Sequence, residues 1–414
     1  MKYKSIFINI IAGLVFLPFV FASDEISKVT LEDAYRAALK KTEVLPIEES
    51  QKRQMDARIE QVDANFYPNF SAKLNYLLQG GDTKPTDQAT LGISVIQPIY
   101  QGGRYQNAFS IAKSEKLSKE FALTSLRIET YSKVAYYFYS ILSAQQDIKN
   151  LDTTVLQTKE IIGELQKRES IGKTKKSEVL MAQSQLVILQ SELKAVEGKL
   201  IIAREQFAFV TGLNHNTTIN NTETFPELKN FEYYLEIVKK RPDVEVLNTN
   251  LIIAGENVNK EKAGHLPSLN LIGDGYPLRT GSMSGVNWDI GLALTFTIFE
   301  GGNIGARVKE AIDKEKEAEL LLSRKNRQVE TEVRIAYQNL INLREQIKTL
   351  ELALVITEKN YHEQKKDYSF SLVTNLDVLQ ALNSFQSTKR SLDRIRIEVM
   401  YAWANLMVSI GQIP

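Results

Sequence analysis

Residues 97–103 read Gln-Pro-Ile-Tyr-Gln-Gly-Gly, and residues 296–302, which lie 199 positions later, read Phe-Thr-Ile-Phe-Glu-Gly-Gly. In both places an alternating apolar run ends at two glycines, and a long helical pattern follows. Glycine adopts backbone angles that other residues avoid, so it suits a sharp turn. We therefore expect strand-to-helix corners at Gly102–Gly103 and at Gly301–Gly302.

The offset of 199 holds without a gap from about residue 38 to residue 212. Matched residues include Pro68 with Pro267, Val179 with Val378, Ala182 with Ala381 and Gly212 with Gly411. A constant register over this distance indicates a structural duplication. We place the first repeat at 23–213 and the second at 231–414. The join at 214–230 is rich in Asn and Thr and is expected to be an exposed linker.

The first 22 residues read as a secretory signal peptide. Lys2 and Lys4 precede an apolar run from Ile6 to Phe21, and Ala22 offers a small residue for cleavage. The run of about 16 residues is short against the ~20 that a spanning helix needs, which disfavours the alternative of a membrane anchor. We expect an exported chain, and any entry into a membrane would use strands.

The composition excludes several classes of site. The 414 residues include no cysteine, so disulfides, thiolate metal ligands and cysteine nucleophiles are absent. A formal net charge of +1 suggests no nucleic-acid partner. The histidines, His215, His265 and His362, lie far apart in the sequence, and no HExxH, nucleophile-elbow or phosphate-loop motif occurs. We expect no catalytic site, no metal site and no cofactor.

Each repeat predicts the order helix, strand, strand, long helix, shorter helix. The first helices are expected at about 31–65 and 231–264, ending before Pro68 and Pro267. Apolar and polar residues then alternate with a period of two, which is typical of strands with one apolar face. Two strands are expected in about 69–100 and two in about 268–299.

The helices after the corners are very long. About 70 residues separate Gly103 from Gly172, which corresponds to ~100 Å of helix. The apolar residues step by three and four, a pattern that makes coiled-coil seams. In the first repeat this stepping involves Ile148, Leu151, Val155, Thr158, Ile162 and Leu165. Turns near Gly172 and Ser371 would fold each long helix back on a shorter one as an antiparallel pair.

Four half-apolar strands leave two structures open. They could form a sheet packed on the chain's own helices, or they could contribute to a closed barrel. Four strands cannot close alone, whereas three chains would supply twelve, an even number within the range of outer-membrane barrels. Strands near ten residues suit a tilted crossing of a bilayer.

The duplicated plan, with Asn-Leu-Asp-Val-Leu-Gln-Ala at 375–381, resembles the TolC family of outer-membrane efflux and secretion proteins. The resemblance covers about residues 30–412. It implies a homotrimer with a twelve-stranded membrane β-barrel and a long coiled-coil α-barrel that extends into the periplasm of a Gram-negative cell. It also implies an outer-membrane exit duct of a tripartite efflux pump or type I secretion system, docked to a periplasmic adaptor protein and an inner-membrane transporter.

In this family, side chains near the second hairpin tip narrow the tube. The family pattern is a tyrosine, a basic residue and a D-V-L-D-A run whose two acids line the lumen. Tyr368 and Asp377 match, but Val373 takes the basic position and Gln380 that of the second acid. We expect a half-acidic constriction of Asp377, Gln380 and Tyr368. The alternative is that Asp377 only stabilises the helix start.

A basic cluster of Lys173, Lys175 and Lys176 marks the first hairpin tip. A solvated turn explains it, and an adaptor contact is the sharper hypothesis. Two other classes of protein stay open at this point: a periplasmic coiled-coil scaffold without a pore, and a secreted hydrolase on a helical stalk. The sequence does not distinguish small-molecule efflux from protein secretion.

Overall fold

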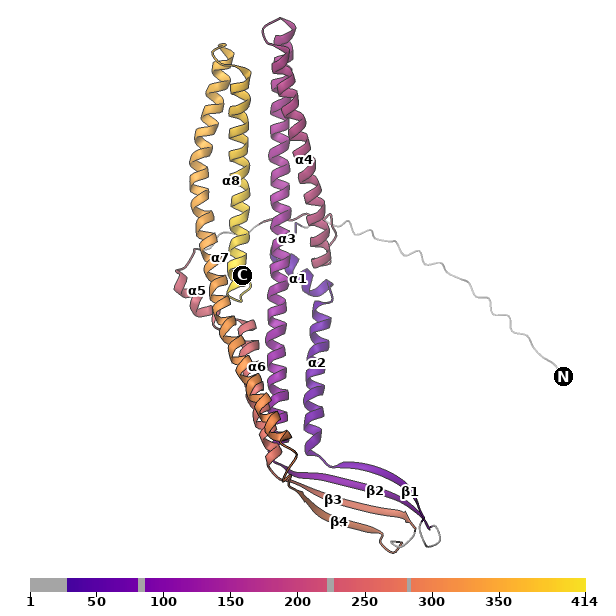
Figure 1. Ribbon diagram of the computed structural model, residues 1–414. Coiled ribbons are helices and arrows are strands. Elements are labelled where there is room, and N and C mark those ends of the chain that lie inside the picture. The colour runs from indigo at the N-terminus through magenta and orange to yellow at the C-terminus, as the bar shows by residue number, and fades with distance from the viewer. Residues whose placement is uncertain (1–27, 81–85, 222–226, 281–283) are drawn as a thin grey trace, which may run out of the picture.

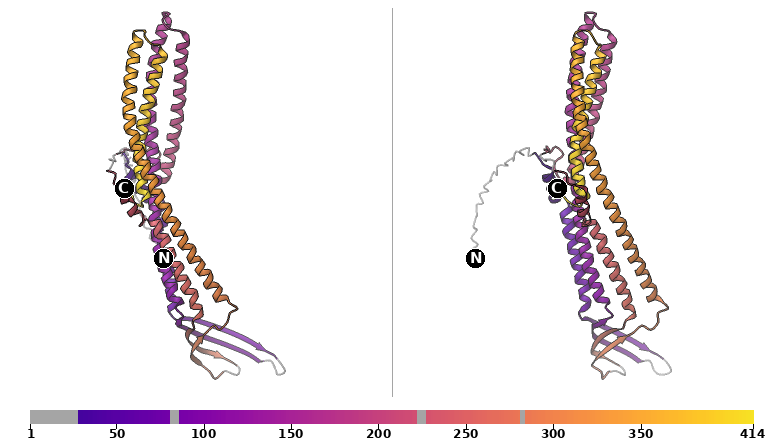
Figure 2. Two further views of the ribbon diagram at one scale, coloured as in Figure 1. Left: turned by 60° about the vertical axis from the view of Figure 1, so that its left-hand side comes forward. Right: turned by 90° about the vertical axis from the view of Figure 1, so that its left-hand side faces the viewer.

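The computed structural model describes residues 28–80, 86–221, 227–280 and 284–414, so the expected signal peptide at 1–22 lies outside it. Long helices form an extended shaft, and a four-stranded sheet projects from one end of the shaft at an angle (Figures 1 and 2). The C-terminus lies about midway along the shaft, beside α1 and α5 (Figure 1). We call this level the waist.

The elements follow the predicted order in both repeats. In the first repeat they are α1 (Leu31–Lys41), α2 (Val44–Asp63), η1 (Ala64–Phe66), β1 (Asn69–Gln79), β2 (Thr86–Gln101), α3 (Arg104–Ser170) and α4 (Lys176–Thr211). In the second they are α5 (Phe231–Val238), α6 (Pro242–Lys262), η2 (Ala263–His265), β3 (Ser268–Arg279), β4 (Trp288–Thr295), α7 (Asn303–Ser369) and α8 (Asn375–Ser409). The prediction of a mainly helical chain with four strands is confirmed.

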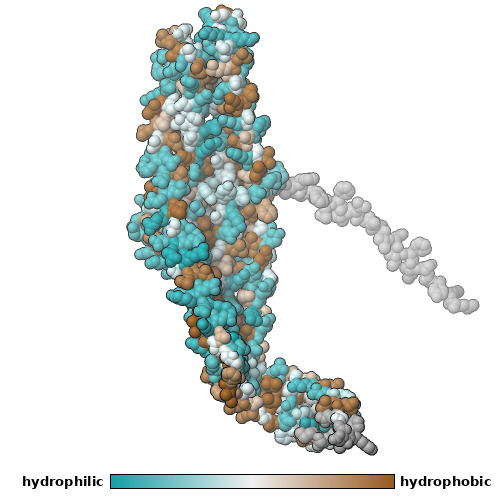
Figure 3. All heavy atoms as spheres, viewed as in Figure 1, coloured by the Kyte–Doolittle hydropathy of each residue, from teal (hydrophilic) through white to brown (hydrophobic). Residues whose placement is uncertain are grey.

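The sheet is antiparallel throughout, in the order β1-β2-β3-β4. One face carries large apolar side chains that are exposed in the single chain: Phe70, Leu74, Tyr76, Leu78, Trp288, Ile290, Leu292 and Leu294. Polar residues alternate with them, so that Ser71, Ser94, Asp274 and Asp289 form one cross-strand row on the other face. Figure 3 shows hydrophobic residues around the corners and over parts of the sheet, whereas the shaft is mostly hydrophilic with hydrophobic streaks.

The fourth strand is shorter than expected. The alternation predicts strand to about residue 299, but β4 ends at Thr295. In the first repeat the equivalent end of β2 pairs with β3 as far as Gln101. Residues 296–299 lie at the open edge of the sheet and have no such neighbour within the chain, so alternation alone does not make them strand.

The first helix of each repeat is broken, which corrects the expected continuous helices. In the first repeat Thr42 has extended backbone angles and separates α1 from α2. In the second repeat Arg241 is extended, and Pro242 opens α6. A residue before proline is pushed away from helical angles, which explains this second break.

Both corners use the glycines that the sequence singled out. Gly102 and Gly103 have φ of 63° and 84°, and Gly301 and Gly302 have φ of 61° and 84°. Residues other than glycine rarely adopt backbone angles in this left-handed region. The long helices α3 and α7 therefore begin at the same local geometry, directly after the turn from the sheet.

Each long helix is paired with two shorter ones that lie end to end along it. Helices α2 and α4 run beside α3, and α6 and α8 run beside α7 (Figures 1 and 2). Apolar side chains fill the α3–α4 and α7–α8 seams, including Leu151, Val155 and Leu189 in the first and Leu340, Val399 and Leu406 in the second. The predicted coiled-coil seams are thus buried within each hairpin.

The two hairpins meet through α3 and α8, and this junction has many polar contacts. Gln386 Nε2 donates to Gln157 Oε1 at 2.8 Å. Nearer the waist, Arg394 binds both carboxylate oxygens of Asp147 at 2.7–2.8 Å. Asn150 Nδ2 donates to the adjacent Asp393 at 2.9 Å. The order of helices across the upper shaft is therefore α4, α3, α8, α7, with α4 and α7 at the open edges.

The connection between the repeats was expected to be exposed. The structure corrects this, because part of the connection is buried. In its described parts, 214–221 and 227–230, Ile219 is buried and pairs as a parallel bridge with Val29. It joins a waist core that includes Leu31, Phe138 and Phe207. This segment thus ties Val29, near the start of the described chain, to the waist.

Candidate functional site at the hairpin tips

The two hairpin tips, residues 171–175 and 370–374, lie side by side at the end of the shaft far from the sheet (Figure 1). Their turns are built alike. Lys173 N donates to Arg168 O, and Leu372 N donates to Asp367 O, 199 residues on. Gly172 adopts φ 70° in the first turn and Ser371 adopts φ 62° in the second. Among the described residues, Ser371 is the non-glycine residue in that left-handed region.

Asp377 is fixed at the start of α8. Its Oδ2 accepts from the backbone nitrogen of Thr374 at 2.8 Å and from the Thr374 hydroxyl at 2.6 Å. These hydrogen bonds, first the hydroxyl and then the backbone one, lower the pKa of Asp377 below its usual value of 3.8. The carboxylate is therefore held as an anion and completes a capping box.

Gln380 lies one helical turn beyond Asp377 and is exposed. The spacing of three places both side chains on neighbouring positions of one helix surface. The lysines of the other tip, Lys173, Lys175 and Lys176, are also exposed. Within this chain the structure does not bring these lysines into contact with Asp377, so each tip presents its own charge to the surroundings.

Tyr368, just before the second tip, contacts the other hairpin. The Arg168 guanidinium, from the last turn of α3, lies over the Tyr368 ring at 4.3 Å from its centroid. Burial raises the pKa of the Tyr368 hydroxyl, and Arg168 opposes that shift. A basic group therefore reaches this tyrosine from the first hairpin, although Val373 replaces the basic residue expected on the second.

Sequence analysis missed Arg168. A signal for it exists: Val373 leaves Tyr368 without its expected basic neighbour, and the turn near Gly172 places the end of α3 at the same level. Only the packing of α3 beside the second hairpin identifies which of the nearby basic residues takes this position.

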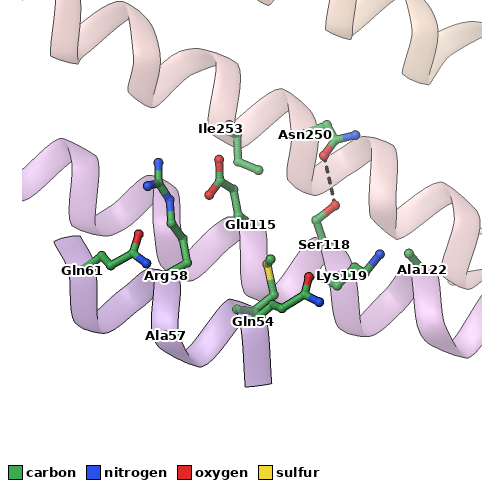
Figure 4. Close-up of a pocket in the computed structure, with 11 residues that line it drawn as sticks. Gln54, Ala57, Arg58, Gln61, Glu115, Ser118, Lys119, Ala122, Asn250 and Ile253 are labelled. Atoms are coloured by element: carbon green, nitrogen blue, oxygen red, sulfur yellow. Dashed lines mark hydrogen bonds between the residues drawn. The ribbon is translucent and has the colours of Figure 1, made fainter. Parts of the chain in front are cut away.

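Lower on the shaft, an open groove of about 690 Å³ lies between α2, α3 and α6. Figure 4 shows its lining, where Ser118 on α3 donates to Asn250 on α6 at 3.0 Å. Arg58, Glu115 and Lys119 also line it. The groove marks where helices of the two repeats adjoin below the waist.

Among the described residues, no three His, Asp or Glu side chains gather in a way that could hold a metal ion. None of the helices in the described part of the chain combines the length and apolar composition needed to cross a membrane.

A family model described as "Outer membrane efflux protein" matches residues 35–213 and again 234–412. The two matches begin and end 199 residues apart, at the offset that relates the two glycine corners. Together they cover most of the chain.

Individual relatives are distant but extensive in coverage. Outer membrane protein TolC of Vibrio cholerae is 22% identical over 381 residues, which span 87% of this chain and 86% of that protein. Proteases secretion protein PrtF of Dickeya chrysanthemi is 21% identical over 292 residues, spanning 57% of this chain and 62% of that protein. Cation efflux system protein CusC of Escherichia coli is 20% identical over 343 residues, spanning 80% of this chain and 75% of that protein.

Solved structures share the fold. The outer membrane protein VceC of Vibrio cholerae superposes with a TM-score of 0.82 at 17% identity, covering 92% of this chain and 96% of that chain. The outer-membrane channel OprN gives a TM-score of 0.84 at 16% identity, covering 92% of this chain and 89% of that one.

Proposed function

We propose, because this chain belongs to the outer membrane efflux protein family, that three copies assemble into one exit duct. The chain is an outer-membrane channel protein for efflux or secretion, and it extends into the periplasm of Gram-negative bacteria. The proposed assembly is a twelve-stranded barrel in the outer membrane, continued by a tube of helices below it.

The two-faced sheet carries this proposal. Its apolar side chains are exposed in the single chain, and β1 and β4 leave backbone groups unpaired at both edges. Unpaired backbone groups are costly in lipid, so the edges must be satisfied by other strands. Sharing among three chains turns the apolar face to lipid and encloses the row that contains Ser94, Asp274 and Asp289.

We infer that the duct is passive and catalyses no reaction, since its family consists of efflux proteins. It would receive cargo from an inner-membrane transporter through a periplasmic adaptor. The names of PrtF and CusC refer to protease secretion and cation efflux in those proteins, and both routes fit a shared exit duct.

The hairpin tips are proposed as the periplasmic constriction. Three copies would place three Asp377 carboxylates and three Gln380 amides around the lumen. The contact of Arg168 with Tyr368 supports a tip held closed partly by links between hairpins of one chain. The exposed Lys173, Lys175 and Lys176 are proposed as an adaptor contact.

Reconstitution in planar bilayers tests the function. We expect cation-selective channels from trimers extracted from the outer-membrane fraction, and weaker cation selectivity for Asp377→Asn. Glu178→Gln is the matched control, because Glu178 lies 199 residues before Asp377 on the other hairpin. Unchanged selectivity and unchanged block by divalent cations in Asp377→Asn would remove the acidic ring. A monomer that fractionates with soluble periplasmic proteins would contradict the duct itself.

The adaptor contact has its own test. Replacing the three lysines by glutamate should abolish transport in cells, while the variant still forms trimers that conduct in bilayers. Intact transport in this variant would leave the lysines as a solvated turn.

A further inference from the structure

We propose that a pocket at the waist binds small aromatic molecules that carry both an amine and a carboxylate. This inference rests on the proposed duct and names a class of cargo for it. The pocket encloses about 580 Å³ between α3, α4 and α8. Small-molecule sites commonly measure about 300–1,000 Å³ and combine aromatic walls with a few polar or charged groups.

The pocket opens on the side of the shaft that faces away from α1. Leu31 and Ala34 of α1 share a buried core with Val134 and Phe138 of α3. Tyr136 lines the pocket, and it lies two residues from both Val134 and Phe138, which corresponds to about 200° around a helix. Helix α1 adds a second layer to the shaft, and that layer belongs outside a tube, because inside it would obstruct the duct. The pocket therefore faces the lumen of the proposed assembly.

Tyrosines form the aromatic wall of the pocket. The Tyr136 ring meets the Tyr401 ring edge to face, with 5.9 Å between the centroids. Phe138 and Tyr139 from the same aromatic run are buried, whereas Tyr136 is 52% exposed. Exposed aromatic rings attract flat aromatic groups and organic cations. Tyr136 and Tyr401 therefore offer a surface for the ring of a ligand.

The two side walls carry opposite charges at equivalent positions of the repeats. Lys199 on α4 and Glu398 on α8 both line the pocket, and they lie 199 residues apart. Both are exposed, and in the described part of the chain neither forms an ion pair. A ligand amine beside Glu398 and a ligand carboxylate beside Lys199 would make two charge-assisted hydrogen bonds. The pocket is thus complementary to an aromatic zwitterion.

The other charged residues in the pocket neutralise each other. Asp147 on α3 is 6% exposed and forms an ion pair with Arg394 on α8 at 2.6 Å. Because this pair is complete, it does not compete for the charges of a ligand. Charge preference should therefore depend on Lys199 and Glu398, and affinity for the ring on Tyr136 and Tyr401.

Three fluorescent probes with one aromatic group test the charge preference. Dansyl-lysine is a zwitterion, dansylcadaverine a cation and dansylglycine an anion. Fluorescence anisotropy measures their binding to purified trimers in detergent, with protein-free micelles as the blank. We expect dansyl-lysine to bind about fivefold more tightly than either other probe, because it alone makes both ion pairs.

Charge variants make the test specific. K199E gives two acidic walls and should make dansylcadaverine the tightest probe, whereas E398K gives two basic walls and should favour dansylglycine. K199E/E398K exchanges the walls and should restore the preference for dansyl-lysine. The control K194E changes an exposed lysine of α4 outside the pocket and should leave the order unchanged. A folding defect would weaken all the probes together and would not reorder them.

The aromatic wall has a separate variant. Y401A removes one ring of the wall and should weaken the three probes alike, by about tenfold. Unchanged binding in Y401A would overturn the assignment of the site, because the ring of each probe would then lie elsewhere.

The direction of the pocket is tested with single cysteines, because the chain contains none. S143C lies in the pocket, and its reaction with a bulky methanethiosulfonate should lower the single-channel conductance in planar bilayers. R36C lies on the exposed side of α1 and is the control, whose conductance should not respond.

The outcomes separate the pocket from the duct. Equal affinity for the three probes in the wild type and in K199E would overturn the pocket and leave the duct. Charge-selective binding without a response of S143C would place the pocket outside the lumen and overturn its role for cargo. Wild-type protein that forms neither trimers nor channels would contradict the duct itself.

Discussion

The two repeats have the same architecture but different polar contacts at the waist. In the first repeat, Glu48 on α2 is buried and accepts two hydrogen bonds from Arg127 on α3, at 2.7 and 2.8 Å. Burial would raise the pKa of Glu48, but hydrogen bonds from Arg127 and Lys52 outweigh it and lower that pKa. The guanidinium of Arg127 still reaches solvent.

In the second repeat the less exposed partner is the base, and it is only partly buried. Arg241 binds both oxygens of Asp243 at 2.7 Å, Glu332 at 2.7 Å and the Ser409 carbonyl at 2.8 Å. Burial opposes the charge of Asp243, yet hydrogen bonds from Arg241 and Lys325 keep its pKa below the usual value. This network connects the α5–α6 break to α7 and to the end of α8.

Neither set of residues recurs at the offset of 199, where Leu247 replaces Glu48 and Thr42 replaces Arg241. The glycine corners, the tip turns and the apolar seams do recur. The backbone turns and the apolar seams therefore specify the shared structure of the two repeats. The ion pairs that hold each break are local and can differ between repeats.

The largest difference is expected from removing the buried ion pairs. Arg241→Ala leaves Asp243 and Glu332 without their main partner and should lower the free energy of unfolding by about 3–5 kcal/mol. Glu48→Ala should cost less, about 1–2 kcal/mol, because the group it leaves unpaired, Arg127, is 42% exposed and can be hydrated, whereas the Asp243 that Arg241→Ala leaves is 27% exposed. Denaturant unfolding followed by helical circular dichroism measures both. Equal losses would show that the two waists are energetically alike.

The two glycine corners should differ in how well they tolerate a side chain. Gly102→Ala adds a clash with Ala263 and Leu266 to the left-handed penalty, and should cost roughly 3 kcal/mol or more. Gly301→Ala should cost only about 1–2 kcal/mol, because an added Cβ meets nothing within 4 Å there and only the left-handed penalty remains. Denaturant unfolding of both variants in detergent, followed by circular dichroism, measures the two losses. Equal losses would contradict the difference in packing at the two corners.

The tip turns allow a reciprocal exchange. Ser371→Gly relieves a left-handed serine and should stabilise the second turn by about 0.5–1 kcal/mol, and Gly172→Ser should destabilise the first by a similar amount. Crowding does not obscure the effect at Gly172, because an added Cβ there meets nothing within 4 Å. Hydrogen exchange of the turn amides reports both changes. Exchange should slow in Ser371→Gly and speed up in Gly172→Ser, and a change in the same direction in both variants would contradict the prediction.

The smallest effect concerns the cap of α8. Hydrogen bonds from Thr374 lower the pKa of folded Asp377, so the cap stabilises α8 fully above the usual pKa of 3.8. Its contribution is lost as the pH falls through the folded pKa. Amide exchange in the first turn of α8, corrected for intrinsic rates, should therefore rise on acidification. Asp377→Asn should remove that pH dependence, and a pH response that persists in this variant would assign it to another group.

Much of the architecture was predictable because it depends on local chemistry. The double glycines after alternating runs predicted both corners, and steps of three and four predicted the buried seams of the hairpins. Pro242 signalled the break before α6, but the sequence analysis treated 231–264 as one helix. Pro46, in the first turn of α2, gives a similar signal for the break at Thr42, because it has no N–H to donate to the Thr42 carbonyl and its ring would clash with that carbonyl in a continuous helix.

The tip was less predictable. Tyr368, Asp377 and Gln380 were found from the resemblance, and the structure places Asp377 in the cap that the sequence left as an alternative. Its role in a ring stays a prediction. Arg168 could not be chosen from the sequence, because its contact with Tyr368 depends on how two hairpins, 200 residues apart, align side by side.

The unbroken length of α3 and α7 has a mechanical consequence. Each runs 67 residues, ~100 Å, from a glycine corner to a tip, whereas the helices beside them are interrupted at the waist. A rotation or tilt imposed at a tip is therefore transmitted to the sheet along two continuous helices. The shorter helices beside them end at the waist, so they can shift relative to one another there while α3 and α7 stay continuous.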